Sequence, residues 1–151
     1  MSTVIDTPAV ATRPARKLGQ EAGKHHFFGY YNKSTWDKTG RYLLAQRTSF
    51  KDVYLTPASE AEIGCFDLQD GDRFHVLNRT HAWNWQMGSQ LQWLDGAPGR
   101  QLIHNIRTPG EGHPYTGFGS AIVDAESGAI RTLPAPVYVV APNSQWALCV
   151  D

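Results

Sequence analysis

The sequence predicts an all-β protein that is built from repeated antiparallel sheets. Its apolar runs are short, rich in aromatic and branched residues, and separated by Gly, Pro, Asn and Asp, without helical periodicity. One pattern occurs twice: an Asp-containing turn, an apolar strand, a gap, and a strand that ends in Asp before a Gly-bearing hairpin. Repeats of four-stranded size are typical of β-propeller blades. We therefore expect about two and a half four-stranded blades, over roughly 30–80, 83–135 and a truncated 137–151.

The first copy of the pattern opens with the turn 36–40. The apolar run 42–45 follows, and we expect it to be a largely buried inner strand. Residues 63–68 and 73–77 come next, as a middle strand and a returning outer strand. Between them, the Asp-Gly pair at 70–71 tolerates the positive φ values of a tight hairpin.

The second copy repeats this order with three strands, over 101–107, 121–124 and 130–133. Asp67 and Asp124, which end the two middle strands, lie 57 residues apart, and the strand-ending Arg47 and Arg107 lie 60 apart. A third copy opens at residue 140 and is cut short. Because an incomplete ring of blades leaves strand edges open, we expect self-association through those edges.

Two polar segments interrupt the copies at the same position. Residues 51–60 and 108–118 both lie between the two apolar strands of their copy, and both are rich in turn-forming residues. Insertions at one position of successive blades lie on one face of a propeller, often its binding face. We therefore expect these two segments to share a face.

The amino-acid composition bears on the partners and the location of the protein. Fourteen Lys and Arg balance fourteen Asp and Glu, and the absence of a basic field argues against a nucleic-acid partner. No apolar run is long enough for a membrane span or a secretory signal, so we expect a cytoplasmic protein without a membrane partner. Residues 1–20 predict a flexible, disordered leader before a domain over 21–151. Cys65 and Cys149 can pair, or each can pack as a small apolar residue.

The densest group of reactive side chains follows the leader. His25 and His26 are of the type that serves as a general base near neutral pH, and the phenol of Tyr31 can exchange a proton where a cation lowers its pKa. In a strand, alternation places His26 and Tyr30 on one side, and Gly29 would supply the bend that aligns His25 with Tyr31. The alternative is an aromatic strand packed between blades, with a histidine satisfied in the core.

A second group surrounds the tryptophans at 83, 85 and 93. Trp83, Asn84 and Gln86 are typical of a carbohydrate site, because indole faces stack on sugar rings and amides bond hydroxyls. The alternative is that the indoles fill gaps between blades and the amides tie loops. Asn105 and Arg107 follow on the next strand, where a guanidinium can pair a substrate carboxylate or serve structure.

The cofactor is unknown from the sequence. Six histidines are sufficient for a divalent metal site, but neither H-x-x-x-H nor H-x-H spacing is present. In a propeller, ligands from different blades meet at the axis, so spacing along the chain would not reveal them.

Three segments of the chain carry a resemblance to a known group of proteins. The strings HHFFGYYNKSTWDKTGRYLLA and AWNWQMGSQLQW, with PVYVVAPN at the third copy, resemble bacterial and fungal seven-bladed β-propeller proteins. That group includes polysaccharide lyases such as the ulvan lyases and, more distantly, the oligogalacturonate lyases. The resemblance covers roughly 24–151 and implies β-elimination on an acidic, uronate-containing oligosaccharide or polysaccharide.

The resemblance also implies roles for individual residues. His25 or His26 would be the base or would neutralise the uronate carboxylate, Tyr31 would be the acid or base, and Arg107 would pair the carboxylate. The expected sugar contacts are Tyr30, Trp83, Asn84, Gln86 and Asn105. Asn32 stands where this motif has an acid. The alternatives are a propeller that binds carbohydrate or protein without catalysis, and an inactive truncated product.

Overall fold

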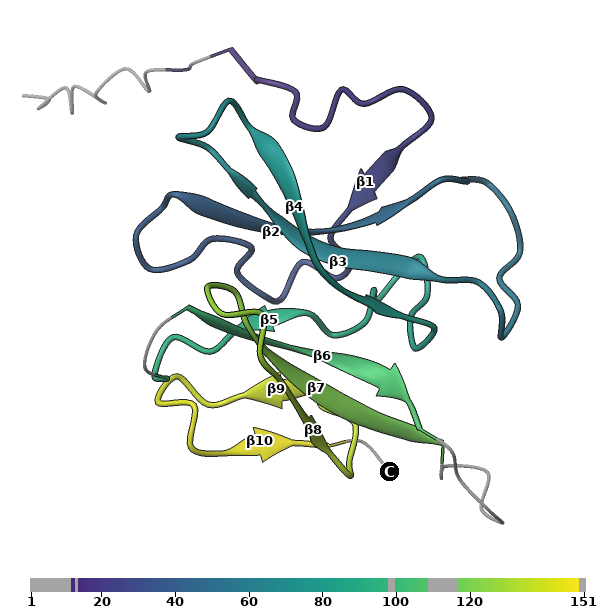
Figure 1. The fold of residues 1–151 in the computed structure, drawn as a ribbon, viewed down its shortest axis with the longest axis vertical. Helices are drawn as coiled ribbons and strands as arrows, with labels where there is room; N and C mark the ends of the chain where they lie inside the picture. The colour runs from purple at the N-terminus through teal and green to yellow at the C-terminus, as the bar shows by residue number, and fades with distance from the viewer. Residues whose placement is uncertain (1–11, 13, 98–99, 109–116, 150–151) are drawn as a thin grey trace, which may run out of the picture.

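The computed structural model describes residues 12, 14–97, 100–108 and 117–149. This part of the chain contains ten strands and no helix, and the strands form two four-stranded antiparallel sheets and one two-stranded sheet (Figure 1). The all-β prediction is confirmed. Within the described residues, no helix is long and apolar enough to cross a membrane.

The first sheet is an antiparallel meander in the order β1-β2-β3-β4. Its strands are β1 (His25–Phe27), β2 (Tyr42–Thr48), β3 (Ala61–Asp67) and β4 (Arg73–Thr80). The predicted inner strand, 42–45, lies in β2 and is the second strand, because β1 pairs along its other edge. The middle position of β3 and the outer position of β4 agree with the prediction.

The predicted Asp-Gly hairpin joins β3 to β4. Gly71 and Asp72 adopt positive φ values of 63° and 56°, as a tight turn requires. Asp67, which ends β3, receives two hydrogen bonds from the guanidinium of Arg41, at 2.8 and 2.6 Å. The pKa of Asp67 is therefore held well below its usual range, chiefly by Arg41.

The second sheet repeats the meander in the order β5-β6-β7-β8. Its strands are β5 (Gln92–Trp93), β6 (Gln101–Arg107), β7 (Phe118–Asp124) and β8 (Ile130–Leu133). A hairpin of β9 (Val139–Val140) and β10 (Ala147–Leu148) follows it. Figure 1 shows the first sheet above the second, with the yellow hairpin beside the lower part of the second sheet.

The pairing register defines which residues of the two sheets are equivalent. Tyr42 pairs with Asp67 in the first sheet, and Gln101 pairs with Asp124 in the second. The offset between β2 and β6 is therefore 59 residues. The offset of 60 that the strand-ending arginines suggest is wrong by one, and Arg107 has no arginine counterpart in β2.

The main core lies between the two four-stranded sheets. Its buried members come from both sheets and from the segment that joins them: Leu44, Ile63, Cys65, Leu91, Trp93, Leu102 and Val123. Within it, the imidazole of His104 is fully buried and lies 2.9 Å from the side-chain nitrogen of Asn78 on β4. Cys65 is buried and Cys149 is exposed, and both are free thiols.

Amide side chains tie each sheet to the segment that follows it. Gln46 donates to the carbonyl of Phe28 and accepts the N–H of Ser89 at 2.9 Å. Its equivalent in the second sheet, Asn105, accepts the N–H of Val137 at 2.7 Å and donates to the Val137 carbonyl at 3.0 Å. The same repeat position thus carries the same type of connection twice.

The two other predictions about organisation concern the leader and the polar segments. Of the leader, residues 1–11 and 13 lie outside the described residues, whereas Arg16 forms an ion pair with Asp72 at 3.0 Å. Residues 51–60 lie between β2 and β3. Most of 108–118 lies outside the described residues.

Candidate functional site

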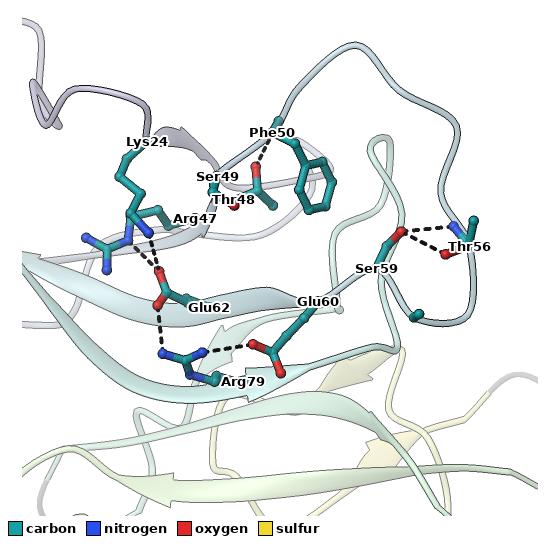
Figure 2. Close-up of a pocket in the computed structure, with 11 residues that line it drawn as sticks. Lys24, Arg47, Thr48, Ser49, Phe50, Thr56, Ser59, Glu60, Glu62 and Arg79 are labelled. Carbon is teal, nitrogen blue, oxygen red and sulfur yellow. Dashed lines mark hydrogen bonds and ion pairs between the residues drawn. The ribbon is translucent and has the colours of Figure 1, made fainter.

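A polar cavity of about 400 Å³ opens at one end of the first sheet, beside the segment 51–60. Basic, acidic and hydroxyl side chains line it, together with one aromatic ring (Figure 2). The lining residues are Lys24, Arg47, Thr48, Ser49, Phe50, Thr56, Ala58, Ser59, Glu60, Glu62 and Arg79.

The charged wall of the cavity follows directly from strand register. His26 pairs with Arg47 across β1 and β2, Arg47 with Glu62 across β2 and β3, and Glu62 with Arg79 across β3 and β4. Directly opposed residues of an antiparallel sheet project from the same face. These four side chains therefore form a row across one face of the sheet, which we call the cross-strand row.

Glu62 is the centre of this row. It accepts hydrogen bonds from Arg47 Nε at 2.6 Å and from Arg79 Nη2 at 3.0 Å, and Lys24 Nζ lies 3.8 Å away. These cations, Arg47 foremost, lower the pKa of the Glu62 carboxyl below its ordinary value. Glu62 is therefore charged at neutral pH and holds three basic side chains around the cavity.

The three basic side chains around Glu62 differ in their further carboxylate partners. Arg47 is buried and has a second carboxylate partner, Glu21, whereas Arg79 is exposed and reaches Glu60 at 2.9 Å. The only carboxylate that Lys24 meets among the described residues is Glu62, at a distance too long for a good hydrogen bond. Lys24 is thus the basic group with most capacity to bind another anion.

Two tryptophans hold the segment 51–60 in place as a wall of the cavity. Trp83 donates its indole N–H to the Ser59 carbonyl at 2.9 Å, and Trp85 donates to the Val53 carbonyl at 3.0 Å. Their rings form a cluster with Phe27 and Phe50, with centroids 4.8 to 6.2 Å apart. Phe50 belongs both to this cluster and to the cavity lining.

The two histidines lie beside the cavity on opposite faces of β1. His25 is opposite Thr48, and His26 belongs to the cross-strand row. The His26 ring packs against Phe66 and Phe74, each with centroids 4.9 Å away. Burial, with Arg47 nearby, lowers the pKa of His26, so its imidazole is neutral at neutral pH.

The two tyrosines form a separate group. Gly29 has a φ of 125° and supplies the predicted bend after β1. The rings of Tyr30 and Tyr31 stack with centroids 4.3 Å apart, and their hydroxyls lie 3.2 Å apart. That hydrogen bond raises the pKa of Tyr30, and Tyr31 is 85% exposed. Neither tyrosine lines the cavity of the cross-strand row.

The remaining predicted residues make local contacts. The Arg107 guanidinium lies 3.9 Å from the ring centroid of Phe118, its partner across β6 and β7. Asn84 accepts the N–H groups of Gln86 and Met87, at 3.0 and 2.7 Å, and closes its own turn. Gln86 is exposed, and Asn105 is the connecting amide already described. None of these residues lines the cavity.

His25 and His26 thus lie on β1 beside the cavity, and Trp83 bonds one of its walls, but none of the three lines it. The other predicted residues lie elsewhere. Sequence reasoning missed Glu60, Glu62 and Arg79, which lie near the ends of strands. Charged residues inside or beside apolar strands were the available signal, but their grouping depends on a register that one sequence does not reveal. Within the described residues, no three His, Cys, Asp or Glu side chains are grouped to hold a metal ion.

Comparison of the chain with protein-family models, with curated proteins and with solved structures finds no match. The chemistry of the site therefore rests on its own side chains. They offer ionised carboxylates, partly committed cations, hydroxyls and one aromatic ring around a cavity of small-ligand size.

Proposed function

We propose that this chain binds a uronate-containing saccharide in the cavity beside the cross-strand row, and that it binds this ligand without cleaving it. The observation that carries the proposal is the composition of the cavity wall, in which Glu62 holds three basic groups beside hydroxyls and the Phe50 ring. Sugar hydroxyls both donate and accept hydrogen bonds, so such a mixed wall can satisfy them.

Each part of a uronate residue has a matching group in this wall. Lys24, with only a 3.8 Å contact to Glu62, would pair with the carboxylate. Arg79 and Glu60 are exposed or half-buried and would bond ring hydroxyls. Phe50 would pack against the apolar face of the sugar ring.

The fold proposal that accompanies this function is a β-propeller, seven-bladed as the resemblance implies. Two successive meanders have the same strand order, and a third hairpin begins with the same turn. In that turn the N–H of Asp37, Leu94 or Ala141 donates to a carbonyl at the start of the following strand in each copy. Equal turns at equal positions support the assignment of successive blades.

Catalysis by β-elimination is the second candidate, favoured by the neutral His26 imidazole next to Arg47. A neutral imidazole can accept a proton, and a guanidinium can neutralise a carboxylate. Tyr31 and Arg107, the other expected catalytic groups, are engaged with Tyr30 and Phe118 instead. Binding without turnover is therefore the better supported function.

Calorimetric titration with oligouronates and with neutral oligosaccharides of equal length tests the proposal. We expect the oligouronate to bind more tightly, and Lys24→Met to weaken it by about tenfold, the typical effect of losing a charged hydrogen bond. Lys38→Met, which removes an exposed lysine of a different loop, is the control. Equal binding of both saccharides, or none of either, would refute the proposal.

The same samples distinguish binding from cleavage. A lyase releases an unsaturated uronate whose ultraviolet absorbance rises with time, whereas a binding protein gives a flat trace. A rise that disappears in His26→Ala would establish the second candidate and contradict binding without turnover.

A further inference from the structure

A second cavity, of about 300 Å³, lies where segments of all three sheets meet. The loop after β1 contributes Lys33 and Trp36, the β5 region contributes Gln92 and Asp95, and the β9 region contributes Val140 and Pro142. We call it the three-sheet cavity. It shares no residue with the cavity of the cross-strand row.

Lys33 is the basic group of the three-sheet cavity. Its ammonium donates to the side-chain oxygen of Asn32 at 3.2 Å and lies 4.8 Å from the ring centroid of Tyr138. Among the described residues, no carboxylate forms an ion pair with it, and partial burial lowers its pKa. A half-buried ammonium without a counter-ion favours the binding of an anion.

Asp95 supplies the opposite charge at another point of the wall. It is exposed, and within the described part of the chain no basic side chain pairs with it. Its turn is fixed, because the N–H of the adjacent Gly96 donates to Ser144 Oγ at 3.0 Å. The cavity therefore presents one cation and one anion that do not satisfy each other.

Much of the rest of the wall is apolar or already hydrogen-bonded. Gln92 accepts the N–H of Val140 at 3.0 Å and donates to the Tyr138 carbonyl at 3.1 Å, so its polar atoms are used. Trp36 is 47% exposed and lines the cavity together with Val140 and Pro142. A ligand here meets apolar surface between its two charged contacts.

We propose that the three-sheet cavity binds a small organic carboxylate that carries a hydrogen-bond donor at its opposite end. The carboxylate pairs with Lys33, the donor pairs with Asp95, and the body of the ligand packs on Trp36. A sugar acid, with hydroxyl donors, and an ω-amino acid, with an ammonium at the far end of an apolar chain, share this chemistry. The proposal does not depend on the saccharide site at the cross-strand row.

The test is a titration of the whole chain with glucuronate, 6-aminohexanoate and glucose, followed by calorimetry and by the indole N–H resonance of Trp36. Loss of that resonance in Trp36→Phe assigns it. We expect glucuronate or 6-aminohexanoate to bind and shift the resonance, and glucose, which lacks a carboxylate, to leave it unmoved. Which of the two carboxylates binds identifies the donor as hydroxyl or ammonium.

Variants separate this site from the other one. Lys33→Met and Asp95→Asn should each weaken binding by about tenfold, whereas Lys33→Arg should retain it. Lys24→Met should leave the Trp36 shift unchanged. Circular dichroism checks that each variant is folded. Absence of binding by both carboxylates, or binding that Lys33→Met leaves unchanged, would overturn the proposal.

Discussion

At the scale of single residues, titratable side chains that are wholly or partly buried explain how the stability of the fold depends on pH. Glu62 and His104 are both held in one protonation state, for opposite reasons. Charged neighbours stabilise the Glu62 carboxylate, whereas burial excludes the charged form of His104. Neither effect follows from residue type, since both depend on which strands lie alongside.

The first prediction concerns Glu62→Gln. The substitution leaves the buried Arg47 with only the exposed Glu21 as an anionic partner, and we expect the free energy of unfolding to fall by about 2 kcal/mol. Denaturant unfolding measures it. Glu126→Gln, at an exposed carboxylate with a 3.9 Å ion pair, is the control and should cost little.

Glu62 also predicts a pH dependence. Its folded pKa is lowered, so its contribution to stability is complete above the ordinary glutamate pKa and is lost as pH falls through the folded value. Wild type should therefore lose more stability than Glu62→Gln between neutral and acid pH. Parallel loss in both proteins would contradict the assignment of Glu62 as the centre of the row.

His104 gives a second pH-dependent prediction. Burial lowers its pKa to about 4, and its Nε2 faces the side-chain nitrogen of Asn78 while Nδ1 faces the Asn105 carbonyl. Nδ1 must then donate and Nε2 must accept, which fixes a neutral tautomer. Below the ordinary histidine pKa of 6.5 the unfolded chain takes up a proton first, so stability should fall as pH drops from 6.5 towards 4.

The His104 prediction is checked by following the imidazole resonances in an acid titration. They should stay those of the neutral ring down to about pH 4. A His104 midpoint near the ordinary histidine value would show that the ring is not enclosed between β4 and β6.

At the scale of elements, the connecting amides explain how one sheet is joined to the next. Gln46 and Asn105 occupy the same repeat position, and both satisfy backbone groups of the incoming chain. Gln92 does the same for β9. Amides suit this role because each can donate and accept at once. The sequence prediction assigned Asn105 to sugar binding, because the sequence does not distinguish a strand amide that binds a sugar from one that bonds the backbone of the next segment.

We expect Asn105→Leu to loosen the segment that leads to the β9–β10 hairpin. The change removes both hydrogen bonds to Val137 and leaves its N–H and carbonyl without their partner, at a cost of about 1–3 kcal/mol. Amide hydrogen exchange at Val137 should accelerate. Gln86→Leu, at an exposed amide, should leave that rate unchanged.

Much of the strand pattern was readable in the sequence, because apolar strands and Asp-Gly hairpins carry strong local signals. β3, β4 and both hairpins lie where the pattern indicates. The aromatic run after residue 24 was considered as one strand, but β1 covers only His25–Phe27, because the chain bends at Gly29. The charged cavity was not recognised either, because its residues lie in four elements and are joined only by cross-strand register.

At the scale of the whole molecule, the β9–β10 hairpin exposes positions that the two complete sheets bury. The shared turn makes Leu148 the equivalent of Leu44 and Ile103. Leu148 is 66% exposed, whereas Leu44 and Ile103 are 1% and 2% exposed. Trp146 beside it is 77% exposed. An exposed apolar strand edge favours association.

We expect the chain to self-associate in a concentration-dependent way, and Leu148→Lys to reduce that association. Light scattering over a dilution series measures both. Ile130→Lys, which changes an exposed apolar residue on β8, is the matched control for the added charge. A monomer at all concentrations would rule out the hairpin as a contact surface.

The two meanders differ in one respect that bears on how such a protein changes over time. β2 and β6 are offset by 59 residues but β3 and β7 by 57, so the connection that walls the cavity is two residues longer in the first sheet. The β2–β3 and β6–β7 ladders keep the same register despite this difference, since Tyr42 opposite Asp67 corresponds to Gln101 opposite Asp124. Evolution or protein engineering can therefore change the length and the residues of the β2–β3 connection, while the strands that carry the charged side chains keep their positions.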